Sequence, residues 1–256
     1  MIGVFDSGSG GLTVLKAIRA RVPSIDVLYL GDIRNAPYGS KSRAELSRLT
    51  FAGMKRLIDG GASRIVSACN SASASLAVSL FDTSELAPDR LIEMVGPAAS
   101  YFRHATARLA LVATPATIES GVYQNAFAML GKDVQAVAIP ELAGAIEFGK
   151  DDAAIERVVR DALAPISKDS FNVLILACTH YPLVFETFRR VVGDGVLIFD
   201  PAEAVADRVE NVWWPQEAGE GRTRFLITQD SAPFRRLVAE MFSEDAGAIE
   251  VVGPLA

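Results

Sequence analysis

The sequence predicts an α/β protein of two pseudo-symmetric domains with mainly parallel sheets, and an active site in the cleft between them. Short apolar segments alternate with longer amphipathic ones along the 256 residues, as is typical of parallel strands covered by helices on both faces. Corresponding strand ends and cysteines also recur at a nearly constant spacing along the sequence. The strand ends at Asp6 and Thr114 lie 108 positions apart, and Cys69 and Cys178 lie 109 apart. The alternative is a single continuous sheet without a repeat.

Several segments are recognisable as individual elements. Ser42 is expected to begin a helix, because Ser-Arg-Ala-Glu forms a capping box with Glu45. Residues 182–192 predict another helix, with Pro182 in its first turn. The expected strands are 2–5, 26–30, 64–68, 91–95, 108–113, 134–139, 172–177, 196–199 and 224–227.

The order of these elements also predicts the domains. We expect one domain of residues 1–94 plus 206–256 and a second of residues 95–205. The segment 224–242 would then pack back on the first domain. In open α/β sheets ligands bind beyond the carboxyl ends of the strands, so two such sheets face to face would enclose a pocket.

Composition excludes several classes of protein. A net charge of −6 and a pI near 5.1 disfavour a nucleic-acid partner. The sequence contains no run of 18 apolar residues, so no membrane span is predicted. The start MIGVFDSGSGG lacks the features of a signal peptide. We therefore expect a cytoplasmic protein with reduced cysteines. The two cysteines and two histidines form a poor set of metal ligands, so no metal is expected.

The two cysteines are the strongest candidates for chemistry. Each follows an apolar strand and precedes polar residues and the start of a helix: Cys69 stands before Asn70-Ser71, and Cys178 before Thr179-His180. A helix N-terminus or a nearby histidine lowers the pKa of a thiol, which can then exchange protons near neutral pH. Two thiols on opposite sides of one carbon would move a proton from one face to the other. The alternative is a pair of buried structural cysteines.

Two strand-end loops accompany the thiols. FDSGSGG places Asp6 at the end of the first strand, followed by glycines whose N–H groups can hold a phosphate or carboxylate. The loop matches neither a dinucleotide fingerprint nor a P-loop. Asp6 would assist one thiol and His180 the other. Residues 35–39, Asn-Ala-Pro-Tyr-Gly, follow the second strand, and N–H groups near Gly39 would close on a ligand carboxylate unless the segment is a simple turn.

Together these motifs resemble a known family. FDSGSGGLTVL, the segment from Gly31-Asp32 to Pro37-Tyr38-Gly39, ACNSAS and ACTHYPL occur in this order and spacing in the cofactor-independent aspartate/glutamate racemase family. The resemblance extends from Ile2 to at least Pro201. It implies an isomerase that interconverts L- and D-glutamate without pyridoxal phosphate or another cofactor. D-glutamate would serve peptidoglycan and hence cell-wall synthesis. Glutamate as the small-molecule partner and a homodimer are implied in the same way.

The resemblance also implies roles for single residues. Cys69 would take the α-proton from D-glutamate and Cys178 from L-glutamate, with Asp6 and His180 assisting. Ser71 stands where the family usually has threonine. The implied substrate-binding residues are Asp6, Ser7, Tyr38, Gly39, Asn70, Ser71, Thr179 and His180, while Thr114 and Thr117 resemble further ligand contacts and Glu147 resembles a glutamate near the second thiol.

Three other functions remain open from the sequence. An aspartate racemase would share the two-thiol chemistry with a shorter substrate. A thiol redox protein would need the cysteine Cα atoms within about 7 Å. A non-catalytic amino-acid-binding relative is the third, although it would have no need of both thiols, Asp6 and His180.

Overall fold

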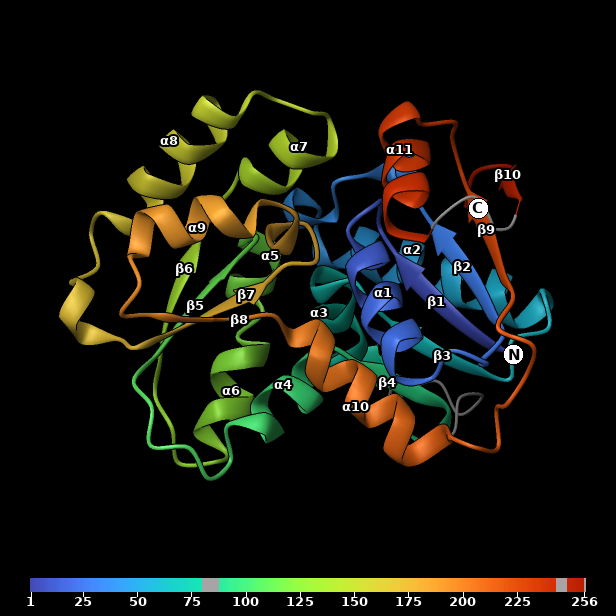
Figure 1. The fold of residues 1–256 in the computed structure, drawn as a ribbon, viewed down its shortest axis with the longest axis horizontal. Coiled ribbons are helices and arrows are strands. Elements are labelled where there is room, and N and C mark those ends of the chain that lie inside the picture. The colour runs from blue at the N-terminus through green and yellow to red at the C-terminus, as the bar shows by residue number, and fades with distance from the viewer. Residues whose placement is uncertain (80–87, 243–247, 256) are drawn as a thin grey trace.

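The protein consists of two parallel β-sheets, each flanked by helices, as the computed structural model shows for residues 1–79, 88–242 and 248–255 (Figure 1). The first sheet has six strands in the order β10-β9-β2-β1-β3-β4, and the second has four in the order β6-β5-β7-β8. Every strand pair in these sheets is parallel. The predicted fold class is therefore confirmed, and the alternative of one continuous sheet is wrong.

The first sheet is built from both ends of the chain. β9 comes from the C-terminal region and pairs with β2, and α11 packs against α1. Both chain ends lie on this side of the molecule (right in Figure 1). The strands are β1 (Ile2–Asp6), β2 (Val27–Gly31), β3 (Arg64–Ser67), β4 (Leu91–Glu93), β9 (Thr223–Ile227) and β10 (Ile249–Val251), and the helices are α1 (Gly11–Arg21), α2 (Arg43–Asp59), α3 (Asn70–Ser79) and α11 (Ala232–Phe242).

The second sheet repeats the central part of the first. Its order β6-β5-β7-β8 corresponds strand for strand to β2-β1-β3-β4, as expected of a duplicated α/β unit. The strands are β5 (Leu109–Ala113), β6 (Val134–Ala138), β7 (Val173–Ala177) and β8 (Leu197–Phe199), and the helices are α5 (Pro115–Glu119), α6 (Val122–Ala128), α7 (Leu142–Glu147), α8 (Asp152–Leu163) and α9 (Phe185–Val192).

Two helices lie in the segments of the chain that connect the two sheets. α4 (Val95–Tyr101) follows the last strand taken from the first half of the chain, and α10 (Pro201–Trp213) precedes the return to β9. α10 packs against α1 and α4, and its Val205 and Val209 belong to the core of the first sheet. The predicted division of the chain stays a prediction; its boundary at 205/206 would fall inside α10.

The local predictions agree with the observed elements apart from two details. The nine expected strands form, with ends shifted by a few residues, and Ser42 caps α2 with the expected capping box to Glu45. The helix expected over 182–192 begins instead as a 3-10 turn, Tyr181–Val184, before α9. β10 was not predicted, because its three residues are largely exposed and carry no long apolar run. Among the described residues, no helix is long and apolar enough to cross a membrane.

Asp200 provides a stability test at the start of α10. Its side chain caps the helix by accepting from the Ala202 N–H, and burial raises its pKa to about 6. Because the unfolded chain holds this proton less tightly, the charged form destabilises the folded protein as pH rises through about 4 to 6. Asn caps a helix equally well. We therefore expect the free energy of unfolding of Asp200→Asn to rise relative to that of the wild type by about 2 to 3 kcal/mol between about pH 4 and pH 7.

The measurement is urea unfolding of both proteins across this pH range. The exposed Asp207 of the same helix, replaced by Asn, is the control and should show no such trend, apart from a small effect of its surface pair with Arg21. A constant difference between wild type and Asp200→Asn at all pH values would contradict the assigned titration.

Candidate active site

The two thiols line one cavity between the sheets. Cys69 follows β3 and Cys178 follows β7, so each lies just beyond the carboxyl end of a parallel strand, where α/β sheets bind ligands. Both are buried and free. The cavity is lined by Ser7, Pro37, Tyr38, Gly39, Cys69, Asn70, Ser71, Thr114, Ala143, Cys178, Thr179 and His180.

A histidine–carboxylate pair adjoins Cys178. The Cys178 sulfur lies 3.9 Å from Nδ1 of His180, and His180 Nε2 lies 2.5 Å from Oε2 of Glu147. All three residues are almost fully buried. Burial lowers the pKa of His180, but its hydrogen bonds with Cys178 and Glu147 prevail, so the pKa stands well above the usual value. A protonated imidazole therefore lies between the Cys178 sulfur and the Glu147 carboxylate.

The glycine-rich loop holds the carboxylate of this pair. Ser9 donates to Glu147 Oε2 from its backbone N–H (3.0 Å) and from its hydroxyl (2.7 Å). Burial raises the pKa of Glu147, yet its bonds with His180 and Ser9 outweigh burial and lower it. Gly10 of the same loop passes so close to Thr179 and His180 that a Cβ there would collide with both. The carboxylate that the loop binds thus comes from α7 of the protein itself.

The surroundings of Cys69 have the opposite electrostatic character. The thiol donates to Ser7 Oγ at 3.5 Å. Burial, reinforced by the nearby negative charge of Asp6, raises the pKa of Cys69 to about 12. This sulfur therefore keeps its proton at neutral pH.

Asp6 ends β1 and makes hydrogen bonds with residues of both halves of the chain. It accepts from the Gly8 N–H at 2.8 Å and from the hydroxyl of Thr179, beside the other thiol, at 3.1 Å. Complete burial raises its pKa, while the charge of His180 and the backbone donors oppose that rise. Asp6 does not line the cavity; its carboxylate contacts Thr179, the residue after Cys178, and its charge contributes to the raised pKa of Cys69.

Hydroxyl groups from the two halves meet beside the cavity. Ser71 Oγ lies 2.9 Å from Thr114 Oγ1 and 3.4 Å from Thr117 Oγ1. Gly39 approaches Thr114 from the other half so closely that a Cβ at this position would overlap it. The smaller side chain of Ser71 thus still places a hydroxyl at the cavity.

Asp32 is a buried carboxylate that holds the segment 35–39 beside the cavity. The sequence did not indicate it as functional. Asp32 accepts from the Tyr38 hydroxyl at 2.7 Å, from Thr228 at 2.7 Å and from the Asn35 amide. It thereby ties the segment that ends at Gly39 to the ends of β2 and β9. A single Asp after a strand carries no signal of these partners, one of which lies 196 positions away.

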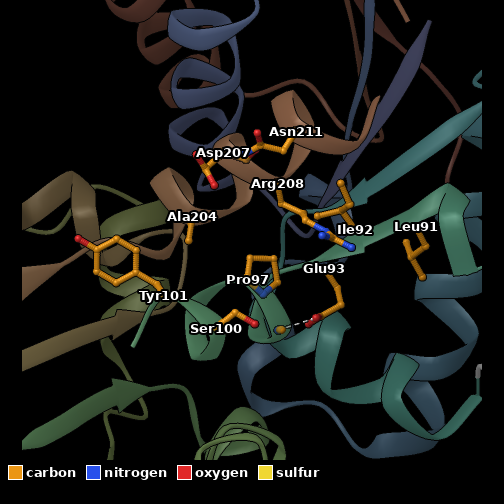
Figure 2. Close-up of a pocket in the computed structure, with 11 residues that line it drawn as sticks. Leu91, Ile92, Glu93, Pro97, Ser100, Tyr101, Ala204, Asp207, Arg208 and Asn211 are labelled. Atoms are coloured by element: carbon orange, nitrogen blue, oxygen red, sulfur yellow. Dashed lines mark hydrogen bonds between the residues drawn. The ribbon is translucent and has the colours of Figure 1, made fainter. Parts of the chain in front are cut away.

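The cavity between the thiols is small. Its volume is about 10 Å³, close to the room that a single water molecule needs. A cavity of about 520 Å³ lies elsewhere, between β4, α4 and α10, where Glu93 and Arg208 extend into it (Figure 2). It contains neither thiol. Among the described residues no group of three or more His, Cys, Asp or Glu side chains is arranged to hold a metal ion.

Comparison with known proteins finds relatives that are similar in sequence and in structure. A glutamate racemase from Acidothermus cellulolyticus is 36% identical over 97% of each chain. The structure of glutamate racemase from Thermus thermophilus in complex with β-chloro-D-alanine is 37% identical, with a TM-score of 0.82 over 98% of this chain and 96% of that one. The enzyme from Francisella tularensis in complex with D-glutamate is 28% identical, with a TM-score of 0.85 over 98% and 97%. The sequence profile of the Asp/Glu/Hydantoin racemase family matches residues 9–209. The chain therefore belongs to the Asp/Glu/Hydantoin racemase family, a family of isomerases.

Proposed function

We propose that the protein is a glutamate racemase that uses Cys69 and Cys178 as its two acid–base groups. It interconverts L- and D-glutamate without a cofactor and supplies D-glutamate for peptidoglycan. The observation that carries the mechanism is the single cavity lined by both thiols, one beside a histidine–carboxylate pair and the other beside Ser7 and Asp6.

The two thiols must begin a turnover in opposite protonation states. We assign the thiolate to Cys178, which lies beside the protonated His180, and the thiol to Cys69, whose raised pKa keeps its proton in place. The Cys178 thiolate removes the α-proton of L-glutamate, and the Cys69 thiol donates its own proton to the opposite face of the carbon. D-glutamate leaves, Cys178 now carries the proton, and Cys69 is the thiolate. The pair thus titrates as one coupled system.

The α-proton is a weak acid, so the site must stabilise the carbanion electrostatically. Ser7, Asn70, Ser71 and Thr179 line the cavity with donor groups, and we assign them to the carboxylates of the substrate. Donors fixed in a buried site are more effective than water because they need no reorganisation when charge develops. We assign Tyr38 and Gly39, which also line the cavity, to the rest of the binding surface.

Binding of glutamate requires the site to open. Glutamate is far larger than a cavity of about 10 Å³. The walls come from separate sheets, with Gly39 and Ser71 on one side and Thr114 on the other. Separation of these walls admits the substrate, and their closure then excludes water from the thiols.

The direct test is loss of optical rotation with purified protein and L-glutamate, D-glutamate, L-aspartate or D-aspartate, without added cofactor. Loss of rotation with both glutamate enantiomers and not with aspartate supports the proposal. Turnover of aspartate in preference to glutamate would assign the alternative substrate, and no turnover of either would favour a binding relative. We further expect a cytoplasmic homodimer, which cell fractionation and light scattering test.

A further inference from the structure

Tyr123 is a buried polar side chain with one defined partner in the site. It lies on α6, is fully buried and packs in the core of the second sheet beside Phe127. Its hydroxyl donates to Oδ1 of Asn70 at 2.6 Å. Asn70 begins α3, which belongs to the other half of the molecule. The Tyr123 hydroxyl therefore joins the two halves at a residue of the active-site wall.

The other end of the Asn70 amide has no partner. Its Nδ2 is buried and makes no hydrogen bond within the described structure, although Asn70 lines the cavity between the thiols. Buried donors without partners are rare and costly, so their presence at a cavity points to a ligand that accepts. The Asn70 NH₂ group has two N–H bonds to offer, and a carboxylate has only acceptors.

Tyr123 determines which end of the amide faces the cavity. A carboxamide turned by half a rotation would present its oxygen in place of its NH₂ group. Burial raises the pKa of Tyr123 well above its usual value, so its hydroxyl keeps its proton. Oδ1 of Asn70 is the acceptor that the described structure gives this buried proton, and a turned amide would leave the proton without that acceptor. With Oδ1 engaged in this way, the NH₂ group is the end that remains for the substrate.

We propose that Tyr123 is a positioning residue that holds the Asn70 carboxamide with its NH₂ group toward a carboxylate of the substrate. This role rests on the proposed racemase function. Since the hydrogen bond spans the two halves, it forms only when they are closed, and the amide is ordered as the substrate becomes enclosed. Without the Tyr123 hydroxyl the amide rotates freely and its oxygen repels the carboxylate in part of the population.

The test is a double-mutant cycle of Tyr123→Phe and Asn70→Ala, read as kcat/KM for glutamate. A hydrogen bond of ordinary strength corresponds to about a tenfold change, so Tyr123→Phe should lower kcat/KM about tenfold in the wild-type background. In the Asn70→Ala background the same change should cost less than about twofold, because the group that Tyr123 positions is gone. Equal losses in both backgrounds would overturn the proposal.

Two further variants separate positioning from simple destabilisation. Tyr181→Phe removes another buried hydroxyl, which donates to the Ile139 carbonyl; it should shift the melting temperature without a comparable loss of kcat/KM. Asn70→Asp replaces the NH₂ group by an acceptor and should be less active than Asn70→Ala. An Asn70→Asp protein more active than Asn70→Ala would show that the oxygen faces the substrate and would overturn the proposal even if Tyr123→Phe failed to fold.

The wild-type assay distinguishes failure of this inference from failure of the proposed function. A wild-type protein that racemises glutamate while the cycle is additive contradicts the role of Tyr123 alone. A wild-type protein without racemase activity contradicts the proposed function, and the positioning role with it.

Discussion

Replacing either cysteine by alanine is expected to lower glutamate racemisation by about a thousandfold or more in both directions, within the range that a positioned acid or base contributes. Each turnover needs one sulfur as base and the other as acid, so loss of Cys69 is as damaging as loss of Cys178. The measurement is loss of optical rotation from each enantiomer, with circular dichroism to confirm that the variants fold.

Serine at the same positions is the matched comparison. Cys69→Ser and Cys178→Ser keep a hydrogen-bonding group of similar shape, yet an alcohol is a far weaker acid than a thiol. They should therefore remain severely impaired despite normal folding. Turnover near the wild-type rate in either alanine variant would refute the assignment of two acid–base thiols.

Glu147→Gln is expected to shift the pH profile of the enzyme. In the wild type, hydrogen bonds to Cys178 and Glu147 keep His180 protonated above its ordinary pKa in spite of burial. Removing the carboxylate takes away its hydrogen bond and its charge, which both raise the pKa of His180, and so lowers that pKa. The imidazolium then loses its proton at a lower pH, and the alkaline decline of kcat/KM shifts to lower pH. At pH 8 we expect about a 10- to 100-fold loss, with a smaller loss at pH 6.

The control is Glu141→Gln, at an exposed position just before α7. It changes the net charge by the same amount and should leave the profile in place. The two directions of racemisation give an internal check, since the equilibrium constant between enantiomers is one and kcat/KM must fall equally in both. A uniform loss at every pH, without movement of the alkaline limb, would show that Glu147 does not act through the protonation of His180.

Much of this architecture follows from local sequence. The continuous apolar segments of β1, β5 and β7 predict buried parallel strands. Because ligands bind beyond the carboxyl ends of such strands, the positions of Cys69 and Cys178 directly after strands predict that both lie where a ligand binds. The nearly equal offsets between the two halves predict the repeat seen in the shared strand order. These features depend on periodicity and on position relative to a strand.

The contacts that organise the site are harder to foresee. Ser9 binds Glu147 138 positions away, and Tyr123 reaches Asn70 across 53 positions. Nothing in the residues next to Tyr123 distinguishes it from an ordinary tyrosine on the buried face of a helix. Its role arises from the packing of one half against the other, and Glu147 was indicated only by resemblance to a family. The assignment of site residues stays a prediction that the variants above test.

The most direct measurement of the two-thiol account is deuterium incorporation during turnover. L-Glutamate incubated with the protein in deuterated water, without cofactor, should yield D-glutamate that carries deuterium at the α-carbon while the L-glutamate recovered early stays protiated. D-Glutamate should give the mirror result, because the proton leaves to one sulfur and arrives from the other. Product that retains the original hydrogen, or recovered substrate that gains deuterium before product forms, would show a single group acting on one face and would contradict the account.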